Sequence, residues 1–395
     1  MNSNSPWKDN RWLPGVLNKD QMLSLMDAHL ITDADRASIG WDASALDLHL
    51  TSEGYEMIRG SVKPCNKTYR EILSDRYYSE RLIPKDGISF RLEKGHCYLF
   101  VIKEKFHPYI KSTPIFGQAT AKSSIGRVDV IARLIVDGMK EYEKFSPSKI
   151  NSGEMFIEIT PITFNVVVRE NLSISQLRFF YGEIEDSIIS SADFIRSVLH
   201  VPDGETNDGT LAVDLSNTLL NGSPEQAAAF CAKENDNPIE LWKKDNNSDR
   251  YAQQEYWKYE PSTDKDNLKS IIIDTNNFYI LRSIERISLN ESVCIYCRAM
   301  DETLGEMRIH YAGFVHPCFG DSREDSKTGT PLIFEVRGHN VKILLTHNEI
   351  LARLFFYRMS KNVVKPPIGS TSTSKKVSYN EQELNLSTLF QERWA

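Results

Sequence analysis

Short apolar runs separated by polar and turn-forming residues dominate the first half of the chain. Leucines alternate with polar residues at positions 46–50, which predicts a half-buried strand. Apolar residues at helical spacing predict a short amphipathic helix within 14–38 and a second helix at 184–199. Further strand-like runs are punctuated by Gly, Pro, Asn and Ser and lie at 97–101, 128–136, 155–159 and 164–168. The pattern predicts a mainly β fold, a barrel or sandwich with short helices.

A similar pattern begins again in the second half of the chain. Residues 209–215 resemble the strand around Asp47. The stretch 232–268 is polar and rich in Asn, Asp and Lys, which predicts a loop or insertion. After it, further strands are expected at 270–273, 278–281 and 292–297.

Near the end of each half, an alternating strand carries a central glutamate, Glu158 or Glu335. A further β segment follows each of them, and then the sequence Phe-Phe-Tyr at 179–181 or 355–357. The glutamate precedes the first Phe by 21 residues in the first half and by 20 in the second. The recurrence of these strands in one order predicts an internal duplication, with coincidence among β-rich segments as the alternative.

The chain is accordingly divided into two similar domains and a tail. The first domain is expected at 1–203 and the second at 204–365. Residues 366–375 are small and polar, so that 366–395 is expected to be a mobile linker followed by a C-terminal segment, which could also be disordered or simply docked.

Composition narrows the class of protein. The 395 residues are 41% hydrophobic and 26% charged, as expected for a soluble globular protein. The net charge of −7 argues against a general nucleic-acid binder. No apolar run approaches the ~18 residues of a membrane span, and the N-terminus has no signal pattern. Six unevenly placed cysteines suggest reduced thiols, so we expect a cytoplasmic protein.

One polar stretch stands out as a candidate anion site. In Lys122–Arg127 two serine hydroxyls are flanked by two cations, with a glycine that allows close approach of the backbone. Hydroxyls, backbone N–H groups and cationic side chains all bind phosphate oxygens. A polar loop before a strand is the alternative interpretation.

Three stretches together resemble the two-domain dCTP deaminases of the dUTPase-like superfamily. Lys122–Arg127 resembles the family's Arg-Ser-Ser-x-x-Arg motif, which contacts the triphosphate and the reacting base. His310–Gly320 resembles the base-binding hairpin, and the strand at Glu335, or its twin at Glu158, resembles the strand with the catalytic glutamate. More weakly, Tyr379–Gln382 resembles the tail segment that folds over bound nucleotide. The resemblance implies a tandem duplication of a dUTPase-like β-barrel.

The resemblance also implies a reaction, the hydrolytic deamination of dCTP to dUTP and ammonia. A buried glutamate would act as a metal-free general acid and base, with Mg²⁺ present only on the triphosphate and no zinc. It further implies a homo-oligomer, with dTTP as a possible inhibitor. The candidate catalytic residues are Glu335, Arg127, Ser123 and Glu158. The candidate substrate-binding residues are Lys122, Ser123, Ser124, Arg127, Tyr311, Ala312, His316, Tyr379 and Gln382.

Zinc-dependent deamination is the alternative chemistry, and fragments of its signature are present. That signature is His-x-Glu followed downstream by Pro-Cys-x-x-Cys. Here Cys294 and Cys297 precede His347–Glu349, and Pro317–Cys318 has no second cysteine three residues on. Cys294 and Cys297 also lie in a strand-like run, where odd spacing places them on opposite faces.

Each half carries only some of the motifs on which this resemblance rests. The place equivalent to Lys122–Arg127 in the second half is 298–303, where the serine pair is missing and acidic residues would repel phosphate. The first half has in turn lost the hairpin pattern at 133–138. We therefore expect a composite site, with its phosphate end in the first domain and Glu335 in the second. The rival arrangement pairs Ser123 and Arg127 with Glu158 of another copy.

Two departures from the family pattern concern the sugar and hairpin contacts, and two other function classes stay open. His316 stands where the hairpin usually has Asp, and Cys318 where it has Gly. A dUTPase-type pyrophosphatase, or a bifunctional deaminase-hydrolase, would usually need that Asp to hold water. The third possibility is a non-catalytic nucleotide-binding regulator on the same fold.

Overall fold

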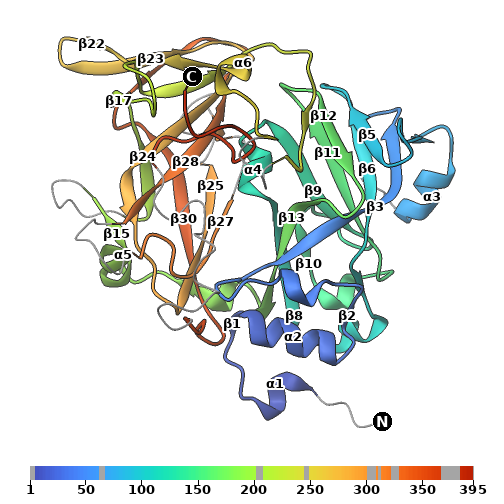
Figure 1. Ribbon diagram of the computed structural model, residues 1–395. Coiled ribbons are helices and arrows are strands. Elements are labelled where there is room, and N and C mark those ends of the chain that lie inside the picture. The colour runs from blue at the N-terminus through green and yellow to red at the C-terminus, as the bar shows by residue number, and fades with distance from the viewer. Residues whose placement is uncertain are drawn as a thin grey trace.

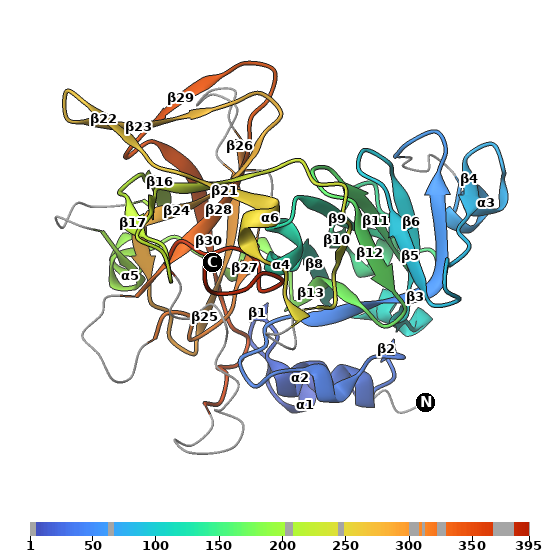
Figure 2. The same ribbon diagram turned by 45° about the horizontal axis from the view of Figure 1, so that its top comes forward.

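The computed structural model describes residues 5–61, 67–201, 208–243, 249–299, 308–309, 313–321, 329–365 and 383–394. Two β-rich bodies lie side by side, one formed by the first part of the chain and one by the rest (Figures 1 and 2). We call elements α1 to β13 the first half and elements η4 to β30 the second half. No helix in the described ranges is long and apolar enough to cross a membrane.

The first half contains thirteen strands and several short helical segments. Its elements are α1 (Pro6–Asp9), β1 (Gly15–Val16), α2 (Lys19–Asp27), β2 (Ile31–Thr32), η1 (Arg36–Ser38), β3 (Leu46–Met57), α3 (Tyr69–Ser74), β4 (Ser79–Arg81), β5 (Ser89–Leu92), β6 (Tyr98–Ile102), β7 (Lys105–Phe106), η2 (Pro108–Ser112), β8 (Ile115–Ala121), α4 (Ser123–Gly126), β9 (Val130–Val136), β10 (Lys144–Phe145), η3 (Pro147–Lys149), β11 (Met155–Pro161), β12 (Val166–Arg169) and β13 (Ser173–Tyr181).

The second half is likewise built mostly of strands. Its elements are η4 (Glu185–Ser187), β14 (Ile188–Ile189), α5 (Ala192–Val198), β15 (Leu199–His200), β16 (Thr210–Asp214), β17 (Thr218–Leu219), β18 (Gln226–Ala227), β19 (Ala229–Ala232), β20 (Ile239–Glu240), α6 (Gln253–Tyr256), β21 (Trp257–Glu260), β22 (Thr263–Lys265), β23 (Leu268–Ile273), β24 (Phe278–Ile287), β25 (Val293–Ala299), β26 (Arg308–Ile309), β27 (Gly313–Val315), β28 (Thr330–Arg337), β29 (Ile343–Thr346) and β30 (Ile350–Arg358).

Strand pairing confirms the predicted duplication. The main sheet of the first half has the order β10-β8-β13-β3-β6-β11-β9. The second half repeats these pairings in the order β27-β25-β30-β16-β24-β28-β26. The outer pairs β5–β12 and β23–β29 also correspond. The fold is therefore mainly β, with two barrel-like sheets and short helices, as expected.

A shared β-bulge fixes the alignment of the two halves. In the first half the bulge lies in β13, next to the residue that pairs with His49 of β3. In the second half it lies in β30, next to the residue that pairs with Ala212 of β16. The backbone N–H of His49 donates to the carboxylate of Glu104, and that of Ala212 donates to Glu285 in the same way. A bulge is a specific local feature, so its recurrence marks equivalent positions.

This alignment shifts the register in which the two halves resemble each other in sequence. Counting from the bulge, Asp47 corresponds to Thr210 and not to Asp214. Phe179 likewise corresponds to Phe356, so that the separation from the central glutamate is 21 residues in both halves. The strands were identified correctly, but short similar strings within them were matched in the wrong register.

Two sequence-based predictions about elements were wrong in extent. Only 192–198 of the predicted helix 184–199 is α-helical, and within it β14 pairs with β30 of the second half. The polar stretch 232–268 is not simply a loop, because it contains β20, α6 and β21, with Tyr256 and Trp257 buried. The predicted helix within 14–38 is confirmed as α2, which begins with a capping box between Asn18 and Gln21.

The largest apolar cluster crosses from one half to the other. Most of its members belong to the first half, but Trp257, Phe278 and Ile280 of the second half pack into it. Leu386 and Phe390 of the C-terminal segment 383–394, called the arm below, belong to the same cluster. One face of the β24–β28 pair is thereby held against the first half, next to α4.

Candidate active site

The stretch Lys122–Arg127 forms a tight turn between β8 and β9. Lys122 is extended and is followed by the single helical turn α4. Ser123 is exposed, whereas Ser124 is buried and Arg127 is 2% exposed. The turn therefore offers a hydroxyl to solvent and directs its second cation into the interior.

Arg127 meets Glu335 across the boundary between the halves. The Nε atom of Arg127 lies 3.9 Å from Oε1 of Glu335 on β28, and both side chains are buried. The sequence predicted this composite pairing. It depends on the packing of the β24–β28 face against the first half.

The environment of Glu335 favours proton exchange near neutral pH. Burial raises the pKa of Glu335 to about 7, against the opposing effect of the Arg127 guanidinium. Desolvation disfavours the charged carboxylate, and the nearby Asp129 raises the pKa further. A carboxyl group with such a pKa can both take up and deliver a proton.

Arg337 and Thr163, which lie beside this pair, were not among the site residues predicted from the sequence. Arg337 lies two positions after Glu335 on β28 and donates to the buried carboxylate of Asp129. The hydroxyl of Thr163 also donates to Asp129, at 2.5 Å. Alternation along β28 places Arg337 and Glu335 on one face, and this was the available signal. The contact fastens β28 to the residues that follow the motif.

Lys122 is held within the first half by an ion pair. Its Nζ lies 2.6 Å from Oδ2 of Asp47 and 3.4 Å from the hydroxyl of Ser173. Burial raises the pKa of Asp47, but Lys122 and Gln176 more than offset this and hold that pKa below its ordinary value. The first residue of the motif is thus fixed against β3.

The arm lies against the motif. Nη1 of Arg127 donates to the carbonyl oxygens of Asn385 and Leu386, at 3.2 and 3.3 Å. The hydroxyl of Ser387 donates to the carbonyl of Ser124 at 2.9 Å. Figure 2 shows this last red segment beside α4. Tyr379 and Gln382, predicted to touch nucleotide, lie outside the described residues.

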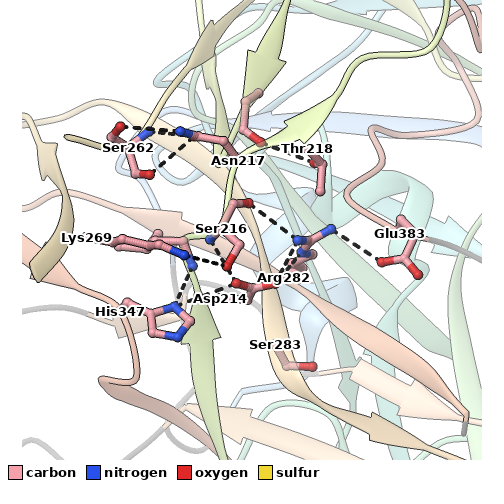
Figure 3. A network of polar contacts seen from close by, with 12 residues as sticks. Asp214, Ser216, Asn217, Thr218, Ser262, Lys269, Arg282, Ser283, His347 and Glu383 are labelled. Atoms are coloured by element: carbon pink, nitrogen blue, oxygen red, sulfur yellow. Dashed lines mark hydrogen bonds and ion pairs between the residues drawn. The ribbon is translucent and has the colours of Figure 1, made fainter. Parts of the chain in front are cut away.

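A polar network on the second half anchors the start of the arm (Figure 3). Glu383 accepts hydrogen bonds from Arg282, at 3.3 Å, and from Arg286, at 2.8 Å. Arg282 is also paired with Asp214 at 2.7 Å. Arg282 lies on the same face of β24–β28 as Glu335, because it follows the partner of Glu335, Ile280, by two residues. The arm therefore contacts both halves around the Arg127–Glu335 pair.

Glu158 occupies the equivalent position in the first half but has other partners. Its Oε2 accepts hydrogen bonds from the hydroxyls of Ser61, at 2.7 Å, and Tyr142, at 3.1 Å. It is directly paired across the sheet with Leu99 on β6, as Glu335 is with Ile280 on β24. The structure does not bring Glu158 together with the motif residues through any described contact.

The predicted base-binding hairpin is described only in part. Tyr311 and Ala312 lie outside the described residues. His316, which follows β27, lies 3.0 Å through Nδ1 from the hydroxyl of Ser44 and also accepts from the Ser44 N–H. Burial, reinforced by the Arg178 guanidinium, lowers the pKa of His316 to about 4, so the ring is neutral at pH 7.

The residues considered for zinc have separate surroundings. Cys294 is buried on β25, and burial raises the pKa of the Cys297 thiol to about 12. His347 accepts from the backbone N–H of Leu215 at 3.1 Å. Within the described ranges, no three His, Cys, Asp or Glu side chains gather as a metal site would require.

Comparison with known proteins relates both halves to one enzyme family. The family model "2'-deoxycytidine 5'-triphosphate deaminase (DCD) N-terminal domain" matches residues 13–183, and the corresponding C-terminal domain model matches 193–390. The fold is similar to that of 2'-deoxycytidine 5'-triphosphate deaminase from Agrobacterium tumefaciens, with a TM-score of 0.74 and 24% identity over 88% of this chain and 96% of that one. No curated protein matches significantly. With both family domains present in order, the chain belongs to the 2'-deoxycytidine 5'-triphosphate deaminase family.

Proposed function

We propose that this protein hydrolyses dCTP to dUTP and ammonia, with Glu335 as the proton carrier. The observation that carries the proposal is the Arg127–Glu335 pair, 3.9 Å apart, beside the serine motif. It joins a cation of the phosphate motif to a carboxyl group whose pKa is raised by burial. Family membership supplies the substrate.

In the proposed reaction the carboxyl group of Glu335 both accepts and donates protons. Glu335 takes a proton from water as the water oxygen bonds to C4 of cytosine, and it passes this proton to N3. It then moves the proton of the new hydroxyl to the amino group. The C4–N4 bond breaks, ammonia leaves and the C4 carbonyl forms. Arg127 remains charged throughout and orients Glu335.

The phosphate end is assigned to the motif. Lys122, Ser123 and Ser124 would bind the triphosphate, whose Mg²⁺ arrives as part of the substrate. Ser123 supports this assignment because it is exposed at the start of the turn. Arg127 links this end to Glu335, so that one turn contacts both parts of the nucleotide.

The arm and the hairpin would complete the enclosure of the substrate. Tyr379 and Gln382 would close over the nucleotide, and Tyr311, Ala312 and His316 would contact the base and sugar. The docking of segment 383–394 on Arg127 and Ser124 supports a covering role for the arm. We also propose a cytoplasmic homo-oligomer inhibited by dTTP, on the family resemblance alone.

A product assay tests the proposed reaction. The protein is incubated with Mg²⁺ and dCTP, and ammonia and pyrophosphate are followed separately. Ammonia without pyrophosphate is expected. Pyrophosphate released only from dUTP in a parallel incubation would identify a dUTPase-type hydrolase. Both ammonia and pyrophosphate from dCTP would identify a bifunctional enzyme, and neither product from either nucleotide with retained dCTP binding a regulator. The neutral His316, already bonded to Ser44, gives no support to a water-holding role there.

A further inference from the structure

Arg178 is a fully buried cation at the junction of the halves. It lies on β13 of the first half, and its side chain extends into the second half. Nη1 donates to the carbonyl of Ile295 on β25 at 3.0 Å, and Nη2 lies 3.4 Å from the carbonyl of Val315 on β27. The guanidinium carbon lies 3.9 Å from the ring centre of Phe314, also on β27. The Arg178 side chain therefore contacts β27 twice, through the Val315 carbonyl and through the Phe314 ring.

This cation has no anionic partner in the described parts of the chain. The titratable groups that act on Arg178 are Cys294, Tyr357 and Tyr296, none of them a carboxylate, and its Nε atom has no hydrogen-bond partner among the described residues. A buried charge without an anionic partner is destabilising, because desolvation of the charge is not offset by an ion pair. The equivalent position of the second half is Phe355, so the fold does not require an arginine there. Packing alone does not explain this residue.

Ser44 connects Arg178 to the residue that follows β27. The Ser44 hydroxyl accepts from Nη2 of Arg178 at 3.0 Å and lies 3.0 Å from Nδ1 of His316. Ser44 is completely buried and lies three residues before Asp47, which holds Lys122 of the phosphate motif. Residues 44–47 therefore contact the motif at one end and the exit of the hairpin at the other.

We propose that Arg178 and Ser44 are positioning residues that set the hairpin strand β27 at a fixed place relative to the phosphate motif. This inference rests on the proposed function, in which the motif and the hairpin bind opposite ends of one nucleotide. A composite site needs such a device, because its two parts come from different halves. The contacts described above are polar contacts that span this gap near β27, where an apolar cluster that includes Phe180 and Phe314 also joins the halves.

The test compares Ser44→Ala, Arg178→Lys and Arg178→Met with the wild-type protein. Affinity for dCTP is measured by calorimetry, KM and kcat for ammonia release by kinetics, and the thermal midpoint by scanning calorimetry. We expect Ser44→Ala and Arg178→Met to weaken dCTP binding and to lower kcat/KM by about tenfold or more, since small misplacements in a site are costly. Arg178→Lys, which keeps the charge, should recover part of the loss.

Ser79→Ala is the matched control. Ser79 is also buried and donates to a backbone carbonyl, that of Leu73, within the first half. The control should leave dCTP affinity unchanged whatever its effect on the midpoint. Unchanged dCTP affinity and kcat/KM in Ser44→Ala would overturn the proposal even if Arg178→Met fails to fold. Because affinity is measured directly, an inactive wild-type protein would refute the proposed reaction without deciding this positioning test.

Discussion

Glu335 and Glu158 occupy equivalent strand positions, yet their surroundings give them different chemistry. Glu335 faces a guanidinium of the other half and has a raised pKa. Glu158 accepts two hydroxyl hydrogen bonds within its own half. A carboxylate already used by two hydroxyls is better suited to holding a loop than to exchanging protons.

Exchanging each glutamate for its amide separates these roles. We expect Glu335→Gln to abolish deamination while dCTP still binds, because the amide keeps the shape and cannot carry the proton. Glu158→Gln should lower the thermal midpoint and leave kcat near the wild-type value. Steady-state kinetics, dCTP calorimetry and thermal melts check these outcomes. Loss of turnover in Glu158→Gln alone would instead place the active pair between two copies of the first half.

The raised pKa of Glu335 predicts a pH dependence. The carboxylate form must take a proton from water, and below a pKa of about 7 the free protein holds Glu335 protonated. We therefore expect kcat/KM to rise with pH through this region and to level off above it. A pH profile of kcat/KM over pH 5 to 9 measures this. A flat profile would show that the ionisation of Glu335 does not limit the reaction.

Substitutions in the motif should differ in kind. Arg127→Ala and Ser123→Ala should reduce activity strongly, because a charge-assisted contact contributes about 1.5–3 kcal/mol. Lys122→Ala should mainly weaken nucleotide affinity, increasingly so with salt, and should also lower stability because Asp47 loses its cation. Kinetics at two salt concentrations and thermal melts distinguish these effects. Normal kinetics in all three variants would exclude the motif as the nucleotide site.

At the scale of elements, the arm is bound by residues of both halves. Leu386, Leu389 and Phe390 are buried in the apolar cluster of the first half, whereas Glu383 is held by arginines of β24. The arm thus depends on both halves being in place.

Truncation after Lys365 should therefore affect both stability and binding. Removal of the buried Leu and Phe side chains should lower the thermal midpoint, since each contributes roughly 1.5–3 kcal/mol. The KM for dCTP should rise because the site loses its cover. Ser387→Ala, which loses the hydrogen bond to the Ser124 carbonyl and the one accepted from the Leu389 N–H, should raise KM with a much smaller change in midpoint. A truncated protein with unchanged KM and kcat would show that the arm has a structural role only.

At the scale of the whole molecule, the Asp129–Arg337 ion pair joins the halves beside the Arg127–Glu335 pair. Asp129 and Arg337 are 208 residues apart in sequence, and the carboxylate of Asp129 is completely buried. Breaking a buried pair commonly costs 3–5 kcal/mol, because one charge remains without its partner.

Arg337→Met tests whether this pair makes the two halves one cooperative unit. We expect the midpoint to fall and the single melting transition to broaden or divide, as the first half loses its fixed contact with β28. Differential scanning calorimetry measures this, and Lys342→Met, which removes the surface pair with Asp274, serves as a control. A midpoint that falls equally in both variants would contradict a special role for Asp129–Arg337.

Much of this molecule was predictable, and the errors have physical causes. Strands with strict alternation, such as those around Leu46 and Glu335, were located correctly because their burial pattern is local. The polar stretch 232–268 was misjudged because Tyr256 and Trp257 are buried by packing against the other half. Arg178 and Arg282 gave no signal as single basic residues within strands, since their partners lie far away in the sequence. The only signal for Arg337 was its place on the same face of β28 as Glu335.

By itself the sequence determined the mainly β class and the duplication, and it supplied the candidate phosphate motif and the two candidate glutamates, because each depends on local alternation and spacing. Only the tertiary structure decided which glutamate lies beside Arg127, where the arm docks and how β27 is held. These features depend on how two similar halves pack against each other. That packing is set by cross-half contacts such as Arg178 to Val315 and Arg127 to Leu386, which no local pattern records.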